Sequence, residues 1–248
     1  MVDLLQQIGL SMGSADKDKV VFLVGPNGSG KSFYLRDIAE ALRGGHRELA
    51  LISNTPFDRF SNMRGIKRVS ASRSSRSPKS VIKRAVADTI EEPNSRFYQI
   101  GATLEYCGYE PRFGFKVLRR RPFPRASMDG IKPDASEFES ALAILEVFDP
   151  TEIIWIDQRE SPHSFSRARE FATVLRHEDQ LRREGYLRDI KVYLEREDRQ
   201  VIELQHGSSG ELSLISSLVF LIATVDDKPF VLVDEPENSL HPHWQREY

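Results

Sequence analysis

The stretch GPNGSGKS, from Gly25 to Ser32, matches the phosphate-binding pattern G-x-x-x-x-G-K-[ST] at every fixed position. It follows the apolar run Val20–Val24, which predicts a short buried strand, and it precedes a segment with helical spacing. Glycines in such a loop let backbone N–H groups turn inward around phosphate oxygens, where a side chain would block the approach. The sequence therefore predicts a nucleoside triphosphate site in an α/β fold.

Two side chains of this loop have expected roles in chemistry. Lys31 would reach the β- and γ-phosphates, and Ser32, in the first turn of the following helix, would ligate Mg²⁺. The positive end of that helix adds to the attraction for phosphate. A glycine-rich turn with a chance lysine is the alternative, but strand, loop and helix patterns all agree with the first interpretation. The expected phosphate-binding residues are Gly25, Pro26, Asn27, Gly28, Ser29, Gly30, Lys31 and Ser32.

Composition indicates a soluble globular protein, long enough for one large α/β domain or two small ones. The 248 residues are 40% hydrophobic and 29% charged, and no apolar run approaches the roughly 20 residues of a membrane-spanning helix. The N-terminus lacks the pattern of a signal peptide. A single cysteine, Cys107, rules out an internal disulfide and fits a cytoplasmic location.

Basic residues are concentrated in two blocks, although the net charge is only −2. Eight lie between Arg64 and Arg84 and six between Arg112 and Arg125, and neither block contains an acidic residue. Such blocks predict contact with nucleic-acid phosphates or with an acidic protein partner. A solvated, serine-rich loop is the alternative for the first block.

Hydrophobic periodicity predicts the elements that connect these features. Helices are expected at 33–42, 81–90, 97–106, 135–148 and 165–181, the last lying on the surface, and again from residue 212. Strands are expected at 48–53, 66–69, 113–118 and 153–156, with a hairpin formed by 190–194 and 201–204. The proline-rich residues 120–133 predict a flexible connection that ends a basic insertion at about 58–133.

A second chemical signal is the apolar segment Phe230–Val233, which predicts a buried strand followed by two carboxylates. Asp234 would hold Mg²⁺ through its water shell, and Glu235 would polarise the attacking water as a general base. Glu235 and Lys31 are thus the expected catalytic residues, and Ser32 and Asp234 the expected metal ligands. An ordinary strand that ends in a solvated acidic turn is the alternative.

The ordered motifs GPNGSGKS, SSGE, VLVDEPE and NSLHP resemble the ATPase core of the ATP-binding-cassette superfamily, in the branch of structural-maintenance-of-chromosomes and DNA-repair ATPases. The resemblance implies one P-loop NTPase domain over residues 1–248, with a mixed central sheet flanked by helices and with ATP and Mg²⁺ as cofactors. It also implies that Ser208, Ser209 and Gly210 bind the γ-phosphate held by a second subunit, so the chain is expected to form a homodimer. The loop Asn238–His241 would communicate across that interface.

The segment DEPENSLHPHWQ resembles more narrowly the ATPases of bacterial anti-phage systems, including those encoded with retrons or paired with a separate nuclease. This implies that ATP binding and hydrolysis control a nuclease or another effector. A transporter ATPase is disfavoured, because the transporter-style LSGGQ motif is absent.

Three departures from the family pattern affect these expectations. Gly207 stands where the signature usually has leucine, and Gln99 is only a weak candidate for the glutamine loop. The family continues into a strand with a switch histidine, whereas this sequence ends at Tyr248. The alternative function is therefore a nucleotide-gated interaction module with little or no turnover.

Other reactive residues have simpler interpretations. Asp157 is expected at a strand end, and Cys107 as a packed hydrophobic residue. A pair of histidines, His241 and His243, is too few for a metal site, and neither His163 nor Ser164 belongs to a recognisable triad.

Overall fold

A computed structural model describes residues 19–45, 47–55, 59–70, 77–91, 95–120, 136–157, 162–225 and 229–236. The chain divides into two compact units, one formed by residues 1–75 with 224–248 and the other by residues 76–223. Each unit has its own sheet, one parallel and one antiparallel. The α/β class is confirmed, and its described strands form these two sheets in place of one mixed central sheet.

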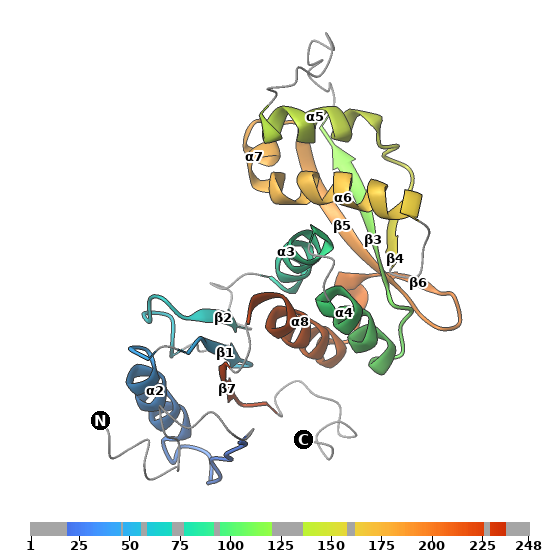
Figure 1. Cartoon of the computed structure of the whole chain (residues 1–248). Coiled ribbons are helices and arrows are strands. Elements are labelled where there is room, and N and C mark those ends of the chain that lie inside the picture. Colours follow the sequence, from blue (N-terminus) through green and yellow to red (C-terminus); the bar gives the residue numbers. More distant parts are fainter. Residues whose placement is uncertain are drawn as a thin grey trace. The chain divides into compact units, whose positions relative to one another are not determined.

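The first unit contains a parallel sheet with the strand order β2-β1-β7. It is built from β1 (Leu49–Ser53), β2 (Lys67–Ser70) and β7 (Phe230–Asp234), together with helix α2 (Lys31–Leu42) (Figure 1). All five residues of the central strand β1 are buried. These elements confirm the expected helix after the phosphate loop and three of the expected strands.

Helix α2 packs on this sheet through residues spaced three and four apart, as an amphipathic helix requires. Phe33, which the periodicity placed in the same apolar pattern, is 57% exposed, and its ring lies under the guanidinium of Arg59. The core of the unit consists of Leu35, Ile38, Ala39, Leu42, Leu49, Leu51, Phe60 and Met63.

The prediction of a buried strand at Val20–Val24 is wrong. These residues form no β-ladder with the described strands, and Val20, Phe22 and Val24 are 76%, 69% and 94% exposed. Only Leu23 packs against the core of the unit. Apolar composition favours burial, but a strand also needs a neighbouring edge to supply hydrogen bonds, and a single segment cannot reveal that edge. In the described structure, the phosphate loop is therefore not preceded by the expected strand.

The second unit contains an antiparallel sheet with the strand order β4-β3-β5-β6. Its strands are β3 (Arg112–Arg119), β4 (Ile154–Asp157), β5 (Leu187–Glu195) and β6 (Val201–Glu203). Its helices are α3 (Pro78–Glu91), α4 (Ser95–Tyr106), α5 (Glu137–Val147), α6 (Pro162–Arg176), α7 (Glu178–Arg183), the 3₁₀ turn η1 (Leu204–His206) and most of α8 (Ser209–Thr224). The predicted hairpin is confirmed, except that Leu204 begins η1.

Aromatic rings join the sheet of the second unit to its helices. Phe171 on α6 lies 5.5 Å from the ring of Phe115 on β3 and 5.3 Å from that of Phe148 after α5. The helix predicted at 165–181 is in fact two helices, α6 and α7, separated at His177. It lies on the surface as predicted, since Arg167, Arg169 and Glu170 are exposed, and its inner side adds the fully buried Phe171 to the core. Its charged residues occupy the outer side of α6, so average composition conceals the apolar stripe.

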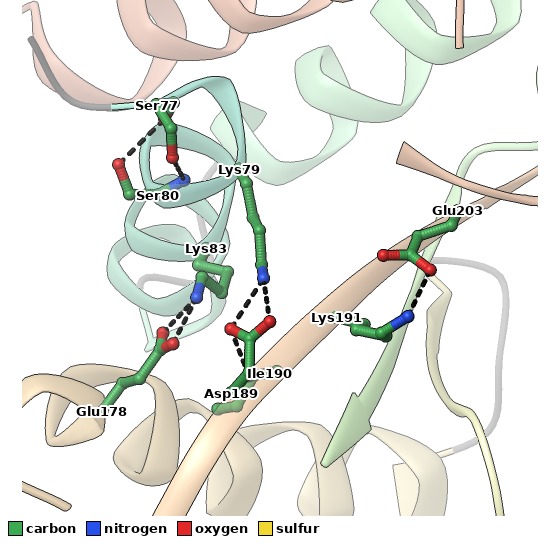
Figure 2. Close-up of polar contacts among 9 residues, drawn as sticks. All are labelled: Ser77, Lys79, Ser80, Lys83, Glu178, Asp189, Ile190, Lys191 and Glu203. Carbon is green, nitrogen blue, oxygen red and sulfur yellow. Dashed lines mark hydrogen bonds and ion pairs between the residues drawn. The ribbon is translucent and has the colours of Figure 1, made fainter. Parts of the chain in front are cut away.

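Two ion pairs attach α3 to the rest of the second unit (Figure 2). Lys79 binds Asp189 at the start of β5, and Lys83 binds Glu178, the first residue of α7. The second pair is buried, with Lys83 6% and Glu178 7% exposed. Burial lowers the pKa of Lys83 from its ordinary value, while the charge of Glu178 opposes this shift.

The predicted flexible connection at 120–133 lies outside the described residues, apart from Arg120. Among the residues that the structure describes, no helix combines the length and the apolar character that crossing a bilayer requires.

We expect Lys83→Ala to lower the free energy of unfolding by about 3–5 kcal/mol, because it leaves the Glu178 carboxylate buried without its partner. Arg84→Ala is the matched control, since it removes an exposed cation that pairs with Asp88 on the same helix and should cost about 0–1 kcal/mol. Urea unfolding of each variant measures the difference. Equal losses in the two variants would contradict a structural role for the buried pair.

Candidate functional site

The phosphate loop of the first unit adopts a conformation that depends on two of its glycines. Gly28 and Gly30 have φ angles of 82° and 90°, in the left-handed region that residues with a side chain rarely adopt. The Ser29 N–H donates to the Pro26 carbonyl at 3.2 Å, which closes the turn before α2 begins. Sequence and backbone geometry therefore agree on a loop that leads directly into a helix N-terminus.

Lys31 lies over this loop. Its ammonium group donates to the carbonyl oxygens of Gly25 at 2.8 Å and Pro26 at 3.2 Å. These neutral acceptors hold the cation at the loop, where phosphate oxygens would form stronger, charge-assisted hydrogen bonds with it. The position fits the expected contact of Lys31 with the β- and γ-phosphates.

A hydrogen bond joins the loop to the strand that carries the carboxylates. The Ser32 hydroxyl donates to Oδ1 of Asp234 at 2.9 Å, across 202 residues of sequence. Asp234, the last residue of β7, is 4% exposed. The two proposed metal ligands, predicted from motifs at opposite ends of the chain, are therefore neighbours.

This pair of ligands fits Mg²⁺. Hydroxyl and carboxylate oxygens are the donors that this hard cation prefers, and nucleotide sites hold it through one or two protein oxygens together with phosphates. Ser53, opposite Asp234 in the register of β1 and β7, is fully buried and its hydroxyl has no hydrogen-bond partner among the described residues. A buried hydroxyl at this edge provides a further polar group for a hydrated ion. Sequence reasoning did not identify Ser53, because serine at a strand end is common.

Glu235 follows Asp234 immediately and differs from it in environment. It is exposed, and its φ of 52° places a residue with a long side chain in the left-handed region. Such a conformation is uncommon outside glycine and is often found where function requires it. The buried Asp234 and the exposed Glu235 thus suit different tasks, metal binding and contact with solvent water.

In the second unit, the residues Ser208, Ser209 and Gly210 form the start of α8. The Ser208 hydroxyl accepts a hydrogen bond from the Glu211 N–H at 3.2 Å, and its carbonyl accepts one from Leu212 at 3.0 Å. Ser208 therefore caps the helix. Ser208 and Ser209 are exposed and Gly210 is buried, so the two serines present polar groups at a helix N-terminus.

Glu211 fixes this turn through contacts that sequence reasoning missed. Its carboxylate accepts a hydrogen bond from the Tyr109 hydroxyl at 2.6 Å and lies 3.7 Å from the Arg196 guanidinium, which also stacks over the Tyr109 ring. Burial, together with the Glu211 carboxylate, raises the pKa of Tyr109. Because Tyr109 and Arg196 come from distant loops, no local pattern could indicate this cluster.

The structure also explains why glycine, and not leucine, occupies position 207. A Cβ atom there would lie 3.3 Å from the Leu204 carbonyl oxygen and 3.3 Å from the Leu212 side chain. Neighbouring atoms would have to shift to admit a side chain as large as leucine. The departure from the family signature therefore matches the tight turn between η1 and α8.

The remaining candidates are placed as follows. Gln99 is exposed on α4, and Asp157 is the last residue of β4, as expected. Cys107 is buried, and burial raises the pKa of its thiol to about 11, which disfavours a nucleophilic thiolate and fits the expected packed residue. His163 and Ser164 fall within α6, where the side chains at those positions are not described, and Asn238–His241 and His243 lie outside the described residues.

Comparison with known protein families gives one match. A family model described as "AAA domain, putative AbiEii toxin, Type IV TA system" matches residues 76–247, more than half of the chain. The match includes Ser208, Asp234 and Glu235, whereas the phosphate loop precedes it. No curated protein and no solved structure matches the chain significantly.

We expect Tyr109 and Glu211 to be energetically coupled. Tyr109→Phe removes the hydroxyl donor and should lower the free energy of unfolding by about 1–3 kcal/mol, because the carboxylate loses a hydrogen bond in a half-buried position. A double-mutant cycle with Glu211→Ala should give a coupling energy of about 0.5–3 kcal/mol. Tyr98→Phe, on the exposed side of α4, is the control and should change stability little. Additive effects would show that the contact does not stabilise the start of α8.

Proposed function

Because the chain belongs to the family described as "AAA domain, putative AbiEii toxin, Type IV TA system", whose members are P-loop ATPases related to ATP-binding-cassette ATPases, we propose that it binds and hydrolyses ATP with Mg²⁺. One observation carries this proposal, the hydrogen bond between Ser32 and Asp234. It brings the magnesium-binding positions of the two motifs within reach of one ion, although the motifs are 202 residues apart.

The residues of the first unit have separate roles in the proposed reaction. The loop N–H groups and Lys31 bind and orient the phosphates, and Ser32 and Asp234 hold Mg²⁺, which neutralises charge on the β- and γ-phosphates when bound. Glu235 accepts a proton from the attacking water. Its exposure at the end of β7 supports this role, because a general base must contact the water that it activates.

We further propose that two copies of the chain complete the site. Ser208, Ser209 and Gly210 of one copy would contact the γ-phosphate bound by the other, with the N–H groups at the start of α8 as donors. The exposure of both serines supports an intermolecular contact. The Tyr109–Glu211 contact supports it as well, since it holds the helix terminus in a defined position.

ATP-driven dimerisation would then control a partner in anti-phage defence, with a nuclease as one candidate effector. The family description names a putative toxin of a type IV toxin–antitoxin system, which supports a role in bacterial defence or growth control. If the chain binds ATP and dimerises without turnover, the alternative function of a nucleotide-gated interaction module applies instead.

Lys31→Ala should weaken binding of ATP·Mg²⁺ by about 10- to 150-fold, because charge-assisted hydrogen bonds contribute about 1.5–3 kcal/mol. Titration with a fluorescent ATP analogue measures this change. Lys116→Ala, which removes a lysine from β3 in the second unit, is the control and should bind like the wild type. Equal affinity for ATP in the wild type and both variants would contradict a role of the phosphate loop in ATP binding.

Glu235→Gln should keep ATP binding and lower the rate of phosphate release by about 10²- to 10⁴-fold, because the amide cannot accept the proton from water. ATP should then accumulate in the dimer, which sedimentation or light scattering detects. Glu197→Gln, in the exposed turn between β5 and β6, is the matched control. Unchanged turnover in Glu235→Gln would exclude Glu235 as the base, and no turnover in the wild type would favour the nucleotide-gated module.

A further inference from the structure

A basic pocket of about 640 Å³ lies in the second unit, at the end of the sheet where α7 leads into β5. Three chain segments line it: the residue after β3, helix α7 and the start of β5 (Figure 1 labels these elements). The lining residues are Arg120, Asp179, Arg182, Arg183, Leu187 and Arg188. Four guanidinium groups and one carboxylate thus give the pocket a net charge of about +3.

Backbone contacts and the buried ion pair hold these segments together. The Arg120 N–H donates to the Tyr186 carbonyl at 3.3 Å, and the Tyr186 N–H donates to Leu181 at 3.0 Å. Glu178, the first residue of α7, is bound to Lys83 of α3, as Figure 2 shows. The arginines therefore project from a fixed framework rather than from a free loop.

The charges of the pocket are available for a ligand. Arg120, Arg182, Arg183 and Arg188 are all exposed. Within the described part of the chain, none of these four guanidinium groups forms an ion pair with a carboxylate. Arg183 donates through Nε to the Asp179 carbonyl oxygen at 3.3 Å, which leaves its two terminal nitrogens as donors. An excess of positive charge in one pocket attracts anions.

We propose that this pocket binds the phosphate backbone of a nucleic-acid duplex. Arginine binds phosphate with two parallel hydrogen bonds, and interfaces with nucleic acid are more polar and more positively charged than those with protein. An acidic protein surface is a poorer fit, because protein interfaces usually contain aromatic or apolar anchors at their centre. Leu187 is the only apolar side chain among the described residues of this lining.

The composition of the lining also indicates which form of nucleic acid binds. Single strands are usually held by aromatic side chains that stack on the bases, and base sequence is read by side chains that reach base edges. Among the residues that the structure describes, the lining contains neither aromatic side chains nor the amide side chains of Asn or Gln. The pocket therefore contacts the backbone of a duplex, independently of its sequence.

This site differs from the basic blocks that the sequence emphasises. In the first block, Lys67, Lys79 and Lys83 pair with carboxylates of the same chain. Of the described residues of the second block, Arg120 lines the pocket, and the other three arginines of the lining come from Arg182–Arg188. Their segment also contains glutamate and therefore has a mixed-charge sequence.

A nucleic-acid duplex would be the partner that the proposed ATPase acts with. Only this biological purpose of the contact rests on the proposed function, whereas duplex binding itself does not. Its test uses the full-length chain without nucleotide, so that failure to bind a duplex and failure to bind ATP are separate results. Anisotropy of a labelled 30-base-pair DNA of arbitrary sequence is measured from 50 to 200 mM NaCl. The wild type should bind, and its affinity should fall steeply as salt increases.

The variant Arg182→Ala/Arg188→Ala should bind the duplex at least about tenfold more weakly, and the slope of log Kd against log salt should fall by about two. Arg182→Lys/Arg188→Lys keeps the charges and should keep the slope, with intermediate affinity because lysine lacks the two parallel bonds. Arg43→Ala, at the end of α2 in the first unit, removes an exposed arginine and is the control. Lys31→Ala should bind the duplex like the wild type.

Several outcomes would overturn the proposal. They are unchanged affinity and slope in the double alanine variant, a preference for a single strand of equal length, and binding of polyglutamate in place of the duplex through the same arginines. Thermal unfolding of each variant separates loss of binding from loss of fold. If the double alanine variant unfolds, duplex affinity is compared between the lysine variant and the single Arg188→Ala variant. Affinity equal to that of the wild type in both would overturn the proposal.

Discussion

The hydrogen bond between Ser32 and Asp234 is the contact on which the candidate site of the first unit depends. It joins the helix that follows the phosphate loop to the strand that ends in two carboxylates. The parallel pairing of β1 with β7 supports it, because this register places Ser53 and Asp234 side by side at the carboxyl edge of the sheet. Ligands of open α/β sheets bind at that edge. The 202-residue separation means that the site forms only when the chain returns to the phosphate loop from a distant part of the sequence.

Most of the intervening chain forms the second unit, where a buried ion pair joins helices α3 and α7. Lys83 and Glu178 are both buried, where an unpaired charge would be strongly unfavourable. Their pairing fixes which end of α7 faces α3. Tyr109 and Glu211 have the same effect at the start of α8. In both cases the polar contact specifies the position of a helix whose exposed end carries serines or arginines.

The sequence predicted most elements because their apolar residues recur with the period of a helix or a strand. Patterns of this kind identified α2, β1 and β7, and the motifs at their ends indicated Lys31, Ser32 and Asp234 as candidate site residues, of which Ser32 and Asp234 lie in contact. Prediction failed where the outcome depends on distant partners. Val20–Val24 has the composition of a strand without a ladder in the described structure, and segment 165–181 forms two helices where its periodicity predicted one. Local composition contains no information about which edge or face another part of the chain will cover.

The basic residues also show that local sequence does not indicate which side chains meet after folding, and here this affects the functional interpretation. A block without acids is conspicuous in sequence, yet Lys79 and Lys83 find carboxylates at Asp189 and Glu178, more than 90 residues away, and are thereby neutralised. By contrast, Arg182 and Arg188 have acidic neighbours in sequence but face the same pocket as Arg120. Electrostatic potential depends on which charges remain close together after folding. A surface that attracts phosphate can therefore be formed by residues that no charge run reveals, while the most basic stretch of a chain is used to hold its helices in place.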